Sequence, residues 1–434
     1  MIVPSIDLQG GAAVQLVGGD EKKIDAGDPR PIARHFGLVG EIAVIDLDAA
    51  KGAGSNAELI EELIDIAPCR VGGGIRDVET AIRWLDRGAE KIILGTAATP
   101  EILRELPRER VIAAVDSRDD RVVVEGWTSE TEANVADRID ALRGYVGGFL
   151  VTFVEREGRM QGLPEDRVRA IVQRAGDARV TVAGGVRDPG DIARADRAGA
   201  DTQVGMALYS DAFDLAEGFC APLTSDRIDA LFPTVVTDAR GHTLGLVYSS
   251  VESIRESLRT RAGVYYSRSR GALWRKGESS GDTQELVRIG ADCDRDALRF
   301  IVRQSGKGFC HTGSATCFGD VRGLGALEAT LRERLEYAPE GSYTKRLLSD
   351  PDLLRRKLLE EATELSEAAD AGEASWEAAD VIYFALVSAI HRGASLESIE
   401  RELDRRALKV SRRKGDAKPS SFSVHGDESR ADER

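Results

Sequence analysis

The chain has 434 residues, more than a single hydrophobic core accommodates, and this length predicts about two to four domains. A net charge of −15 argues against nucleic acid or an anionic membrane surface as the main partner. No apolar run approaches the roughly 18 residues that span a bilayer, and the first residues lack a signal-peptide pattern. We therefore expect a cytoplasmic protein that contacts neither membrane nor nucleic acid.

The first 210 residues alternate short β-branched runs with amphipathic helical stretches, and we assign residues 1–222 to one domain. Strand-like runs such as EIAVIDLD (41–48) and KIILGT (91–96) alternate with helical patterns such as VETAIRWLDRGA (78–89). This alternation predicts a parallel sheet with helices outside it, and about eight such units at this length fit an α/β TIM barrel.

An internal repeat supports closure of this barrel. The segment 70–97 resembles the segment 179–208 when the two are aligned with Arg76 opposite Arg187. Two half-barrels that descend from one duplicated ancestor would give this pattern.

Glycine-rich loops follow strands in both halves of the repeat. Glycine lets backbone N–H groups approach a phosphate, and a helix that begins behind the loop favours the anion. For any single loop a tight barrel turn explains the glycines equally well, but the duplication favours a ligand with a phosphate at each end. The candidate phosphate-binding residues are Gly73, Gly74, Gly95, Thr96, Gly184, Gly185 and Gly205.

The same region resembles the isomerase of histidine biosynthesis that converts the aminoaldose ProFAR to its ketose. The matching segments are PSIDLQGG (4–11), IDLDAAKG (45–52), VGGGIRD (71–77), ILGTAA (93–98), EGW (125–127), AGGVRD (183–188) and VGMALY (204–209). The resemblance implies a barrel over about residues 1–212, with Asp7 on the first strand as the catalytic base.

The second catalytic group of that family is an aspartate in a segment like T-D-I-S-R-D-G, which here reads TFVEREG (152–158). Phe153 occupies the aspartate position, and the internal repeat places Asp46 opposite it. A phenyl ring cannot donate a proton, and general acid–base assistance is typically worth about 10²–10⁴-fold. Glu155 is the candidate substitute, so we expect a degenerate barrel that binds a bis-phosphate ligand without turning it over well.

Three cysteines fall close together in the polar segment that follows, in a chain where disulfides are not expected. They are Cys293, Cys310 and Cys317. Three thiolates with an open fourth position suit a catalytic Zn²⁺ with a bound water, and buried unreactive cysteines are the alternative. Asp292, Asp294 and Asp296 could hold Mg²⁺, or they form an acidic surface strand.

Upstream of the cysteines, the segment YYSRSRGALWRKGESSGDTQ (265–284) is dense in arginine, lysine, serine and glycine. These residues are typical ligands of phosphate and ribose, although a solvated basic loop has the same composition. The candidate substrate-binding residues are Arg268, Ser269, Arg270, Trp274, Lys276 and Glu278.

The strings YSRSRG, LWRKGE, DCDRDA and CHTG together resemble phosphoribosyl-AMP cyclohydrolase, over about residues 225–320. The resemblance implies a small, mainly β, α+β domain (223–322) that opens the adenine ring of its substrate with a zinc-activated hydroxide. It implies His311 as the proton-transfer partner. It also implies a homodimer in which each zinc takes Cys293 from one subunit and Cys310 and Cys317 from the other.

The last part of the chain is helical in pattern and carries acidic groups at helical spacing. In KLLEEATEL the candidates are Glu360, Glu361 and Glu364, and in WEAADVIYF they are Glu377 and Asp380. Residues three or four apart share a helix face, so two antiparallel helices could converge these carboxylates on Mg²⁺. Solvated acidic helix faces are common, and on its own this pattern is weak evidence.

The strings SYTKRLLSD, KLLEEATEL and EAADVIYFALV resemble phosphoribosyl-ATP pyrophosphohydrolase, an all-α family, over about residues 324–415. The resemblance implies an all-α domain (323–420) that releases pyrophosphate from phosphoribosyl-ATP and so supplies the cyclohydrolase substrate. The polar tail, 421–434, is predicted to be disordered.

These patterns favour a bifunctional histidine-biosynthesis enzyme for phosphoribosyl nucleotides, with Zn²⁺ and Mg²⁺ as cofactors and an isomerase-like barrel in front. Two alternatives concern the barrel: it is an active isomerase in a trifunctional chain, or a binding and scaffold module without turnover. A third alternative is a structural zinc module joined to a house-cleaning nucleotide pyrophosphatase.

Overall fold

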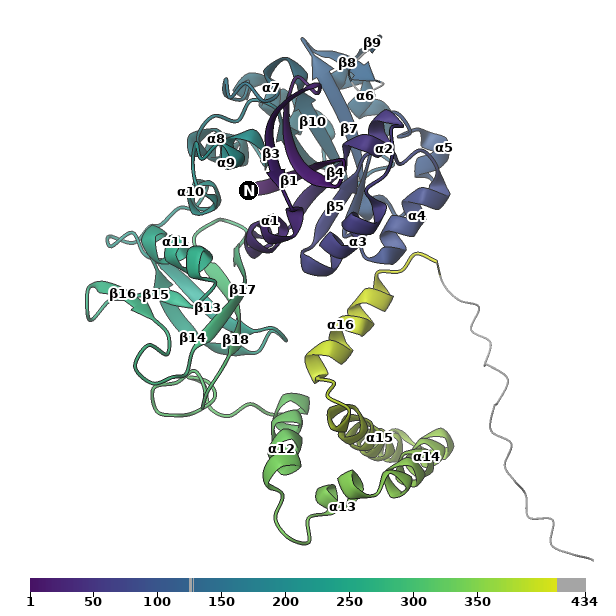
Figure 1. The fold of residues 1–434 in the computed structure, drawn as a ribbon, viewed down its shortest axis with the longest axis vertical. Coiled ribbons are helices and arrows are strands. Elements are labelled where there is room, and N and C mark those ends of the chain that lie inside the picture. The colour runs from purple at the N-terminus through teal and green to yellow at the C-terminus, as the bar shows by residue number, and fades with distance from the viewer. Residues whose placement is uncertain (125–126, 128, 412–434) are drawn as a thin grey trace, which may run out of the picture.

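The computed structural model describes residues 1–124, 127 and 129–411 (Figure 1). Glu125 and Gly126 of the EGW segment, and the tail predicted to be disordered (421–434), lie outside the described residues. The described chain forms a barrel, then a small region of strands, then a group of helices. This order confirms the predicted fold class.

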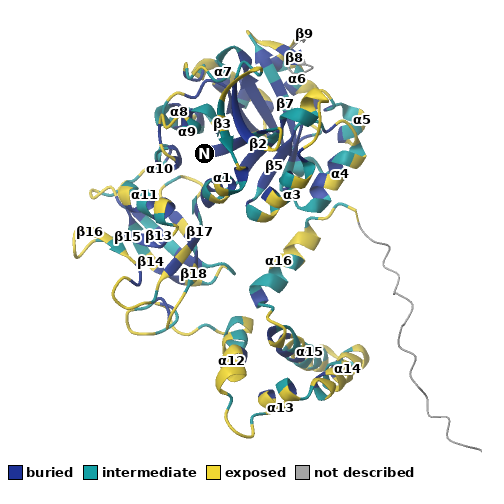
Figure 2. Ribbon diagram, in the orientation of Figure 1, coloured by how far each residue is buried: buried dark blue, intermediate teal, exposed yellow. Residues whose placement is uncertain are grey.

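Within the described residues, eight parallel strands close into the predicted barrel, because β10 pairs both with β11 and with β7. In chain order these strands are β1 (Ile2–Gln9), β4 (Ile42–Asp46), β5 (Cys69–Gly72), β6 (Lys91–Leu94), β7 (Val111–Arg118), β10 (Gly148–Phe153), β11 (Arg179–Ala183) and β12 (Ala200–Val204). Figure 2 shows these strands among the most buried elements of the chain.

Two hairpins extend the barrel, one after β1 and one after β7. Their strands are β2 (Ala12–Val17), β3 (Glu21–Gly27), β8 (Arg121–Val124) and β9 (Ser129–Asn134). The helical elements around the barrel are α1 (Pro29–Phe36), η1 (Gly37–Val39), α2 (Leu47–Lys51), α3 (Ala57–Ile66), α4 (Val78–Arg87), α5 (Pro100–Leu103), η2 (Arg108–Arg110), α6 (Val135–Leu142), η3 (Val154–Arg156), α7 (Glu165–Ala175), α8 (Pro189–Arg197), α9 (Met206–Tyr209) and α10 (Leu215–Cys220).

The two halves of the barrel repeat the same local geometry at their glycine loops. A side chain at Gly73 would collide with the backbone of Asp46, and one at Gly184 would collide with the backbone of Phe153. Both glycines also have positive φ, a conformation that other residues rarely adopt. In both halves, therefore, the strand ends pack directly on the glycine loops.

The middle region contains a mixed sheet in the order β14-β13-β18-β17, together with a separate hairpin. Its elements are β13 (Phe232–Asp238), β14 (Thr243–Ser249), α11 (Val251–Thr260), β15 (Val264–Ser267), β16 (Ala272–Arg275), β17 (Gln284–Ala291) and β18 (Leu298–Gln304). The buried residues of this sheet are continuous with the core of the barrel.

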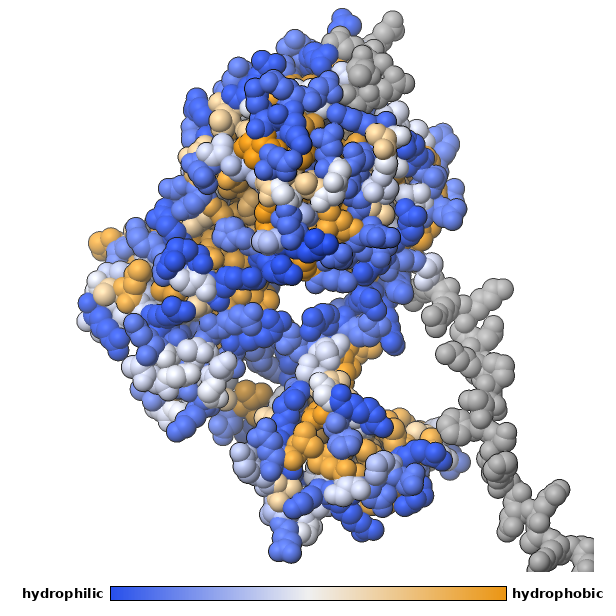
Figure 3. All heavy atoms as spheres, viewed as in Figure 1, coloured by the Kyte–Doolittle hydropathy of each residue, from blue (hydrophilic) through white to orange (hydrophobic). Residues whose placement is uncertain are grey.

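The C-terminal helices form a separate small core. They are α12 (Leu324–Tyr337), α13 (Tyr343–Ser349), α14 (Pro351–Glu367), α15 (Ala371–His391) and α16 (Leu396–Ala407). The core residues include Leu347, Phe384 and Val387. Hydrophobic side chains also reach the surface here, among them Trp376 at 72% exposure, and Figure 3 shows hydrophobic patches on this part of the molecule.

Both later regions contact the barrel at the amino ends of its strands. Arg295 of the middle region donates to Asp196, which lies just before β12, and β17 packs on η1, just before β4. At the end of the helical region, the backbone N–H of Val410 donates to Asp86, just before β6, at 2.6 Å. These contacts leave the carboxyl ends of the strands on the opposite end of the barrel (Figure 1).

Asp46 provides a test of how the first half-barrel is held together. Its carboxylate is 2% exposed and accepts hydrogen bonds from the N–H of Ala49 and from both the backbone and the side chain of Asn56. Asp46→Ala leaves these buried donors unpaired, so we expect a loss of about 2–4 kcal/mol in the free energy of unfolding. Hydrogen exchange at the barrel strands measures this loss.

The matched control is Asp28→Ala, because Asp28 caps α1 from an exposed position. We expect that variant to lose only about 0.5–1 kcal/mol. Equal losses for the two variants would contradict the role assigned to the buried Asp46 network.

Candidate active sites

A cavity of about 1140 Å³ opens at the carboxyl ends of the barrel strands. All seven residues predicted to bind phosphate line it, and they come from both halves of the repeat. Basic side chains also line the cavity, namely Lys51, Arg76 and Arg138. The cavity therefore combines glycine loops with positive charge, which suits an elongated anionic ligand.

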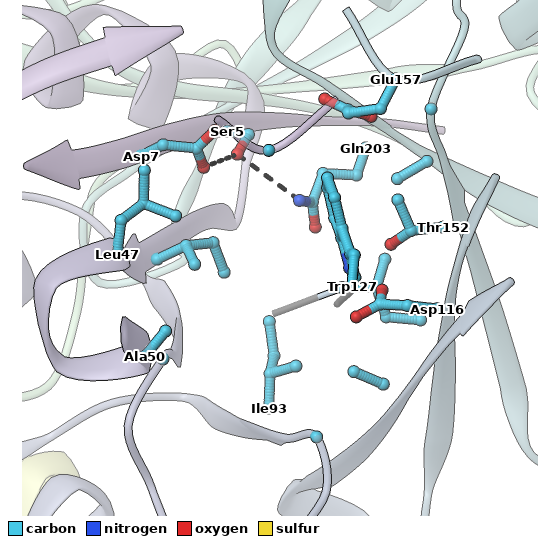
Figure 4. Close-up of a pocket in the computed structure, with 18 of the residues that line it drawn as sticks. Ser5, Asp7, Leu47, Ala50, Ile93, Asp116, Trp127, Thr152, Glu157 and Gln203 are labelled. Atoms are coloured by element: carbon cyan, nitrogen blue, oxygen red, sulfur yellow. Dashed lines mark hydrogen bonds between the residues drawn. The ribbon is translucent and has the colours of Figure 1, made fainter. Parts of the chain in front are cut away.

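The side chains that face this cavity follow from the two-residue alternation of a β-strand. On β1, Ser5 and Asp7 point inward, and on β7 Asp116 does so. On β10, Thr152 points inward (Figure 4), and Leu150 also lines the cavity. The same alternation directs the neighbouring positions toward the surrounding helices.

Phe153 belongs to the outward-facing set, and this corrects the inference drawn from its sequence position. Its ring is fully buried under the guanidinium of Arg167, at 4.8 Å, and it does not line the cavity. Asp46, its counterpart in the first half, caps α2 instead of facing the cavity. An aspartate at position 153 would therefore also face away from a ligand.

Glu155, the candidate substitute acid, also lies outside the cavity lining. Its carboxylate pairs with Arg167 at 2.7 Å, and Arg167 in turn reaches Asp120. This ion pair directs Glu155 away from the site, so the structure does not support it as the acid of the barrel.

Glu157, two residues further on, lines the cavity, and the sequence analysis missed it. Burial raises the pKa of Glu157 to about 8, and the charges of Asp7 and Asp116 add to the effect. The signal was present in the sequence, because the compared segment T-D-I-S-R-D-G carries a second acidic position before its glycine. Glu157 occupies that position.

Asp7 lines the same cavity as Glu157. Desolvation raises the pKa of Asp7 to about 6, although a hydrogen bond from Ser5 acts against this. At neutral pH Asp7 is therefore mostly ionised while Glu157 is mostly protonated. Two carboxyl groups with pKa values pushed apart in one cavity form a complementary base and acid.

Asp116 is a third cavity carboxyl that the sequence analysis missed. Burial raises its pKa, and hydrogen bonds from Trp127 and Thr152 partly offset this. Asp116 is the counterpart of Asp7 in the second half-barrel, in IAAVDSR (112–118) against VPSIDLQ (3–9). The internal repeat could have identified it.

In the middle region, Cys310 lies in a tight turn that the sequence spacing could not define. The backbone N–H of Cys310 donates to the carbonyl of Ser314, and the hydroxyl of Thr312 donates to the sulfur at 3.1 Å. Hydrogen bonds from Thr312 and Ser314 hold the pKa of Cys310 near 6. A thiol that ionises this readily is a good metal ligand.

Cys317 lies beside Cys310, and the N–H of Cys317 donates to the carbonyl of Leu244 on β14. Burial and the neighbouring Cys310 raise the pKa of Cys317. His311 is exposed, with its Nδ1 3.9 Å from the sulfur of Cys310. The structure thus brings together three of the predicted residues of this site.

Cys293 is not part of that group within one chain. Among the described residues, no set of three metal-ligating side chains within 4.8 Å of one another includes a cysteine. Cys293 is exposed, and the adjacent carboxylates of Asp292, Asp294 and Asp296 do lie within 4.8 Å of one another. A metal ion held by Cys310 and Cys317 would need a further ligand from elsewhere.

The predicted substrate-binding residues of this region differ in position. Arg268, Ser269 and Arg270 are exposed at the turn between β15 and β16, and Glu278 is also exposed. Lys276 is buried, lies over the ring of Phe309, and its charge partly offsets the rise in the pKa of Cys317. Trp274 is half-buried and packs against the hydrophobic core near Tyr265.

In the helical region, α14 and α15 bring Glu361, Glu377 and Asp380 within 4.8 Å of one another. The Oε2 atom of Glu377 is buried and has no hydrogen-bond partner in the described residues. Burial and the charges of Glu364, Glu361 and Asp380 raise the pKa of Glu377. These features suit a site for a divalent cation.

Glu360 does not join this carboxylate group. It is exposed and pairs with Lys357 at 2.7 Å, and the same lysine also reaches Glu361. Helical spacing predicted that Glu360 and Glu364 share a face, but the partner helix lies nearer to Glu361. The five predicted ligands thus reduce to Glu361, Glu377 and Asp380, with Glu364 close by.

The fold defines an α/β-barrel protein with carboxyl groups in its cavity, joined to two regions that carry groups of potential metal-ligating side chains. Comparison with known families is more specific. Residues 1–214 match the family of histidine biosynthesis proteins, residues 245–319 match phosphoribosyl-AMP cyclohydrolase, and residues 324–407 match phosphoribosyl-ATP pyrophosphohydrolase.

The barrel is similar over 236 residues to a phosphoribosyl imidazole-4-carboxamide isomerase of Gemmatimonas aurantiaca. The two are 38% identical, and the match covers 50% of this chain and 99% of that protein. The chain therefore belongs to the histidine biosynthesis protein family, and it carries cyclohydrolase and pyrophosphohydrolase domains in addition.

Multifunctional proteins are also similar to the chain. It is 54% identical over 207 residues to a histidine biosynthesis trifunctional protein of Komagataella pastoris, covering 48% of this chain and 24% of that protein. It is 54% identical over 204 residues to a histidine biosynthesis bifunctional protein of Schizosaccharomyces pombe, covering 47% and 49%. The chain thus spans a quarter to a half of these relatives' length. Among the described residues, no helix is long and apolar enough to cross a membrane.

The raised pKa of Glu157 predicts a pH-dependent stability. Folding favours the protonated form of Glu157. The contribution of Glu157 to the free energy of unfolding is therefore present at pH 4–5 and is lost as the pH rises through about 8. Glu157→Gln removes the cost of ionising a buried carboxyl group. We expect the variant to be more stable than the wild type at pH 8.5, by on the order of 2–4 kcal/mol, and nearly equal at pH 5. Urea unfolding at both pH values measures the difference.

Glu155→Gln is the matched control, because Glu155 is paired with Arg167. We expect that variant to lose stability at both pH values, since Arg167 is left with one partner fewer. A difference between Glu157→Gln and wild type that does not change with pH would contradict the protonated state of Glu157.

Proposed function

We propose that the chain catalyses consecutive steps of histidine biosynthesis on phosphoribosyl nucleotides. The helical domain releases pyrophosphate from phosphoribosyl-ATP, and the middle domain hydrolyses the adenine ring of the resulting phosphoribosyl-AMP. The observation that carries this proposal is that each matched segment contains its own converging set of polar groups. The product of the first reaction is the substrate of the second, so the two assignments support each other.

In the middle domain, Cys310 and Cys317 would hold Zn²⁺ together with Cys293 of a second subunit. Their chemistry fits, because Cys310 ionises readily and Cys317 lies beside it. Zinc bound there would lower the pKa of its water and supply hydroxide for attack on the purine ring. His311 lies next to the thiolates and would transfer the proton, and Lys276 would contribute positive charge beside them.

In the helical domain, Glu361, Glu377 and Asp380 would hold Mg²⁺. The buried and unpartnered oxygen of Glu377 supports this assignment, because such an atom gains most from a cation. Magnesium bound there would offset the charge of the triphosphate. Glu364, close to the group, would accept a hydrogen bond from the attacking water or complete the ligand set.

The Asp7 and Glu157 pair favours a further activity for the barrel, the isomerisation of ProFAR. An aldose-to-ketose isomerisation needs an acid to open the sugar ring and a base to remove a proton from the adjacent carbon. Glu157 and Asp7 have suitable protonation states at neutral pH. This removes the main argument for a barrel without turnover, which rested on Phe153.

Binding without turnover remains the second candidate for the barrel, because the glycine loops and basic groups support binding alone. A structural zinc module joined to a house-cleaning pyrophosphatase is less well supported. A structural site needs four ligands, and the described residues of one chain bring only two cysteines together.

Single variants separate the three activities in one assay. Given phosphoribosyl-ATP, Mg²⁺ and Zn²⁺, the wild-type chain should form the ketose. Glu377→Gln should leave phosphoribosyl-ATP unconverted, Cys310→Ser should accumulate phosphoribosyl-AMP, and Glu157→Gln should accumulate ProFAR. We expect each variant to slow its own step at least about 100-fold. Chromatography of the reaction mixture identifies the intermediate.

Glu155→Gln is the control for the barrel, and it should form ketose at nearly the wild-type rate. Accumulation of ProFAR by the wild type would show that the barrel only binds. Preference for ordinary nucleoside triphosphates over phosphoribosyl-ATP would favour the house-cleaning alternative.

The shared zinc site predicts complementation between two inactive variants. In a mixed dimer of Cys293→Ser and Cys310→Ser subunits, one site carries both changes and the other is intact. Mixed protein should therefore regain up to about a quarter of the wild-type cyclohydrolase activity, because half of the dimers are mixed and each has one working site. Co-expression of the two variants with different tags, followed by the activity assay and zinc analysis, tests this.

Cys310→Ser mixed with Cys317→Ser is the matched control, since both residues lie on the same side of each site. That mixture should stay inactive. Recovery in both mixtures, or in neither, would contradict a site that takes Cys293 from one subunit and the other two cysteines from its partner.

A further inference from the structure

Ser5 is a buried polar residue in the wall of the barrel cavity, next to the proposed base. Its side chain is 3% exposed and lies two residues before Asp7 on β1, so both point to the same face of the strand. The Ser5 hydroxyl donates to Oδ1 of Asp7 at 3.0 Å (Figure 4).

Gln203 continues this hydrogen-bonded chain from the neighbouring strand. β12 pairs with β1, and the amide Nε2 of Gln203 donates to the hydroxyl of Ser5 at 3.4 Å. A hydroxyl has one proton to give, and here it accepts from Gln203 while it donates to Asp7. The hydroxyl proton of Ser5 therefore points toward Asp7, because its oxygen accepts the hydrogen bond from Gln203.

Packing does not require a hydroxyl at position 5. Nearby inward-facing residues of the barrel, such as Ile93 and Leu150, are hydrophobic. Alanine would fill nearly the same space. A buried hydroxyl needs a partner, and the partners of this one are a cavity carboxylate and an amide that also lines the cavity.

We propose that Ser5 and Gln203 are positioning residues that orient the Asp7 carboxylate and hold it ready to accept a proton from the substrate. The proposal rests on the isomerase function proposed above for the barrel. Ser5 fixes one carboxylate oxygen, which leaves the other to face the ligand. Gln203 acts one step further out by fixing the hydroxyl of Ser5.

Several acidic groups lie near Asp7. Glu157 and Asp116 face it across the cavity, and Tyr209 of α9 lies close enough for the charge of Asp7 to raise the pKa of that buried hydroxyl. On β4, Asp46 is held by Asn56, and on β2 the nearest polar side chain is the neutral Gln15. The hydrogen bond from Ser5, by contrast, lowers the pKa of Asp7 and so favours its ionised form.

The test measures isomerase kinetics and the ionisation of Asp7 separately in the full chain. In Ser5→Ala we expect kcat to fall about 10-fold at pH 7 with KM changed less than about twofold, because Asp7 loses the hydrogen bond that orients it while the phosphate site is unchanged. The acidic limb of the pH profile should move up by about one pH unit, because loss of a hydrogen bond to a charged group disfavours the ionised form. Gln203→Met should give a smaller shift in the same direction.

Ser117→Ala is the matched control, because Ser117 is a fully buried serine on a barrel strand that contacts Arg167 outside the cavity. It should leave the pH profile unchanged. Ser5→Thr, which keeps a hydroxyl, should restore the wild-type profile, and melting temperatures exclude a folding defect.

Carboxyl NMR of aspartate-labelled protein reports the ionisation of Asp7 without turnover, with Asp7→Asn to assign the signal. A midpoint that moves up in Ser5→Ala, with ketose formed by the wild type, supports the proposal. An unchanged midpoint or an unchanged pH profile overturns it. If the wild type forms no ketose, the proposed isomerase fails, and the positioning role fails with it even where the NMR midpoint moves.

Discussion

Closure of the parallel strands into a barrel, with side chains alternating between inside and outside, is the constraint on which the N-terminal site depends. Once the ring is closed, every second residue of a strand faces the cavity and cannot turn away without breaking the ladder. This is why Asp7 and Asp116 face the cavity while Phe153 does not. It also brings Ser5 beside Asp7, because the two are two residues apart on β1 and face the same side. Asp7 and Asp116 are therefore held by strands, whereas Glu157 lies in a loop.

The other two sites depend on weaker constraints. In the helical domain, spacing along α14 and α15 brings carboxylates to the same side, but the crossing of the helices decides which of them meet. Glu361 joins Glu377, and Glu360 pairs with a lysine on its own helix. In the middle domain, a tight turn brings Cys310 to Cys317, and Thr312 stabilises the thiolate. Two features of these sites oppose folding: the like charges around Glu377 and the buried carboxyl groups of the barrel. Both lower the free energy of unfolding, as is common at functional sites.

The way the regions join leaves the barrel cavity free. The middle and helical regions contact the amino ends of the barrel strands, through residues such as Asp196 and Asp86, and the cavity opens at the carboxyl ends. Barrel strands carry their ligand sites at the carboxyl ends, so the amino ends can take on structural contacts without affecting the chemistry. The continuous core shared by the barrel and the middle region gives this contact a hydrophobic basis.

The sequence by itself determined the order of the three regions, the closed barrel, its duplicated glycine loops, and most residues of the candidate sites. These follow from periodicity, from glycine positions and from motifs, all of which are local properties of the chain. It did not determine which side chains meet, because that depends on strand facing and helix crossing. The exclusion of Phe153 and Glu155 from the cavity and the position of Glu157 in its lining were decided only by the tertiary structure. The physical reason is that burial and neighbouring charges, which set the protonation of these groups, arise from residues far apart in the sequence.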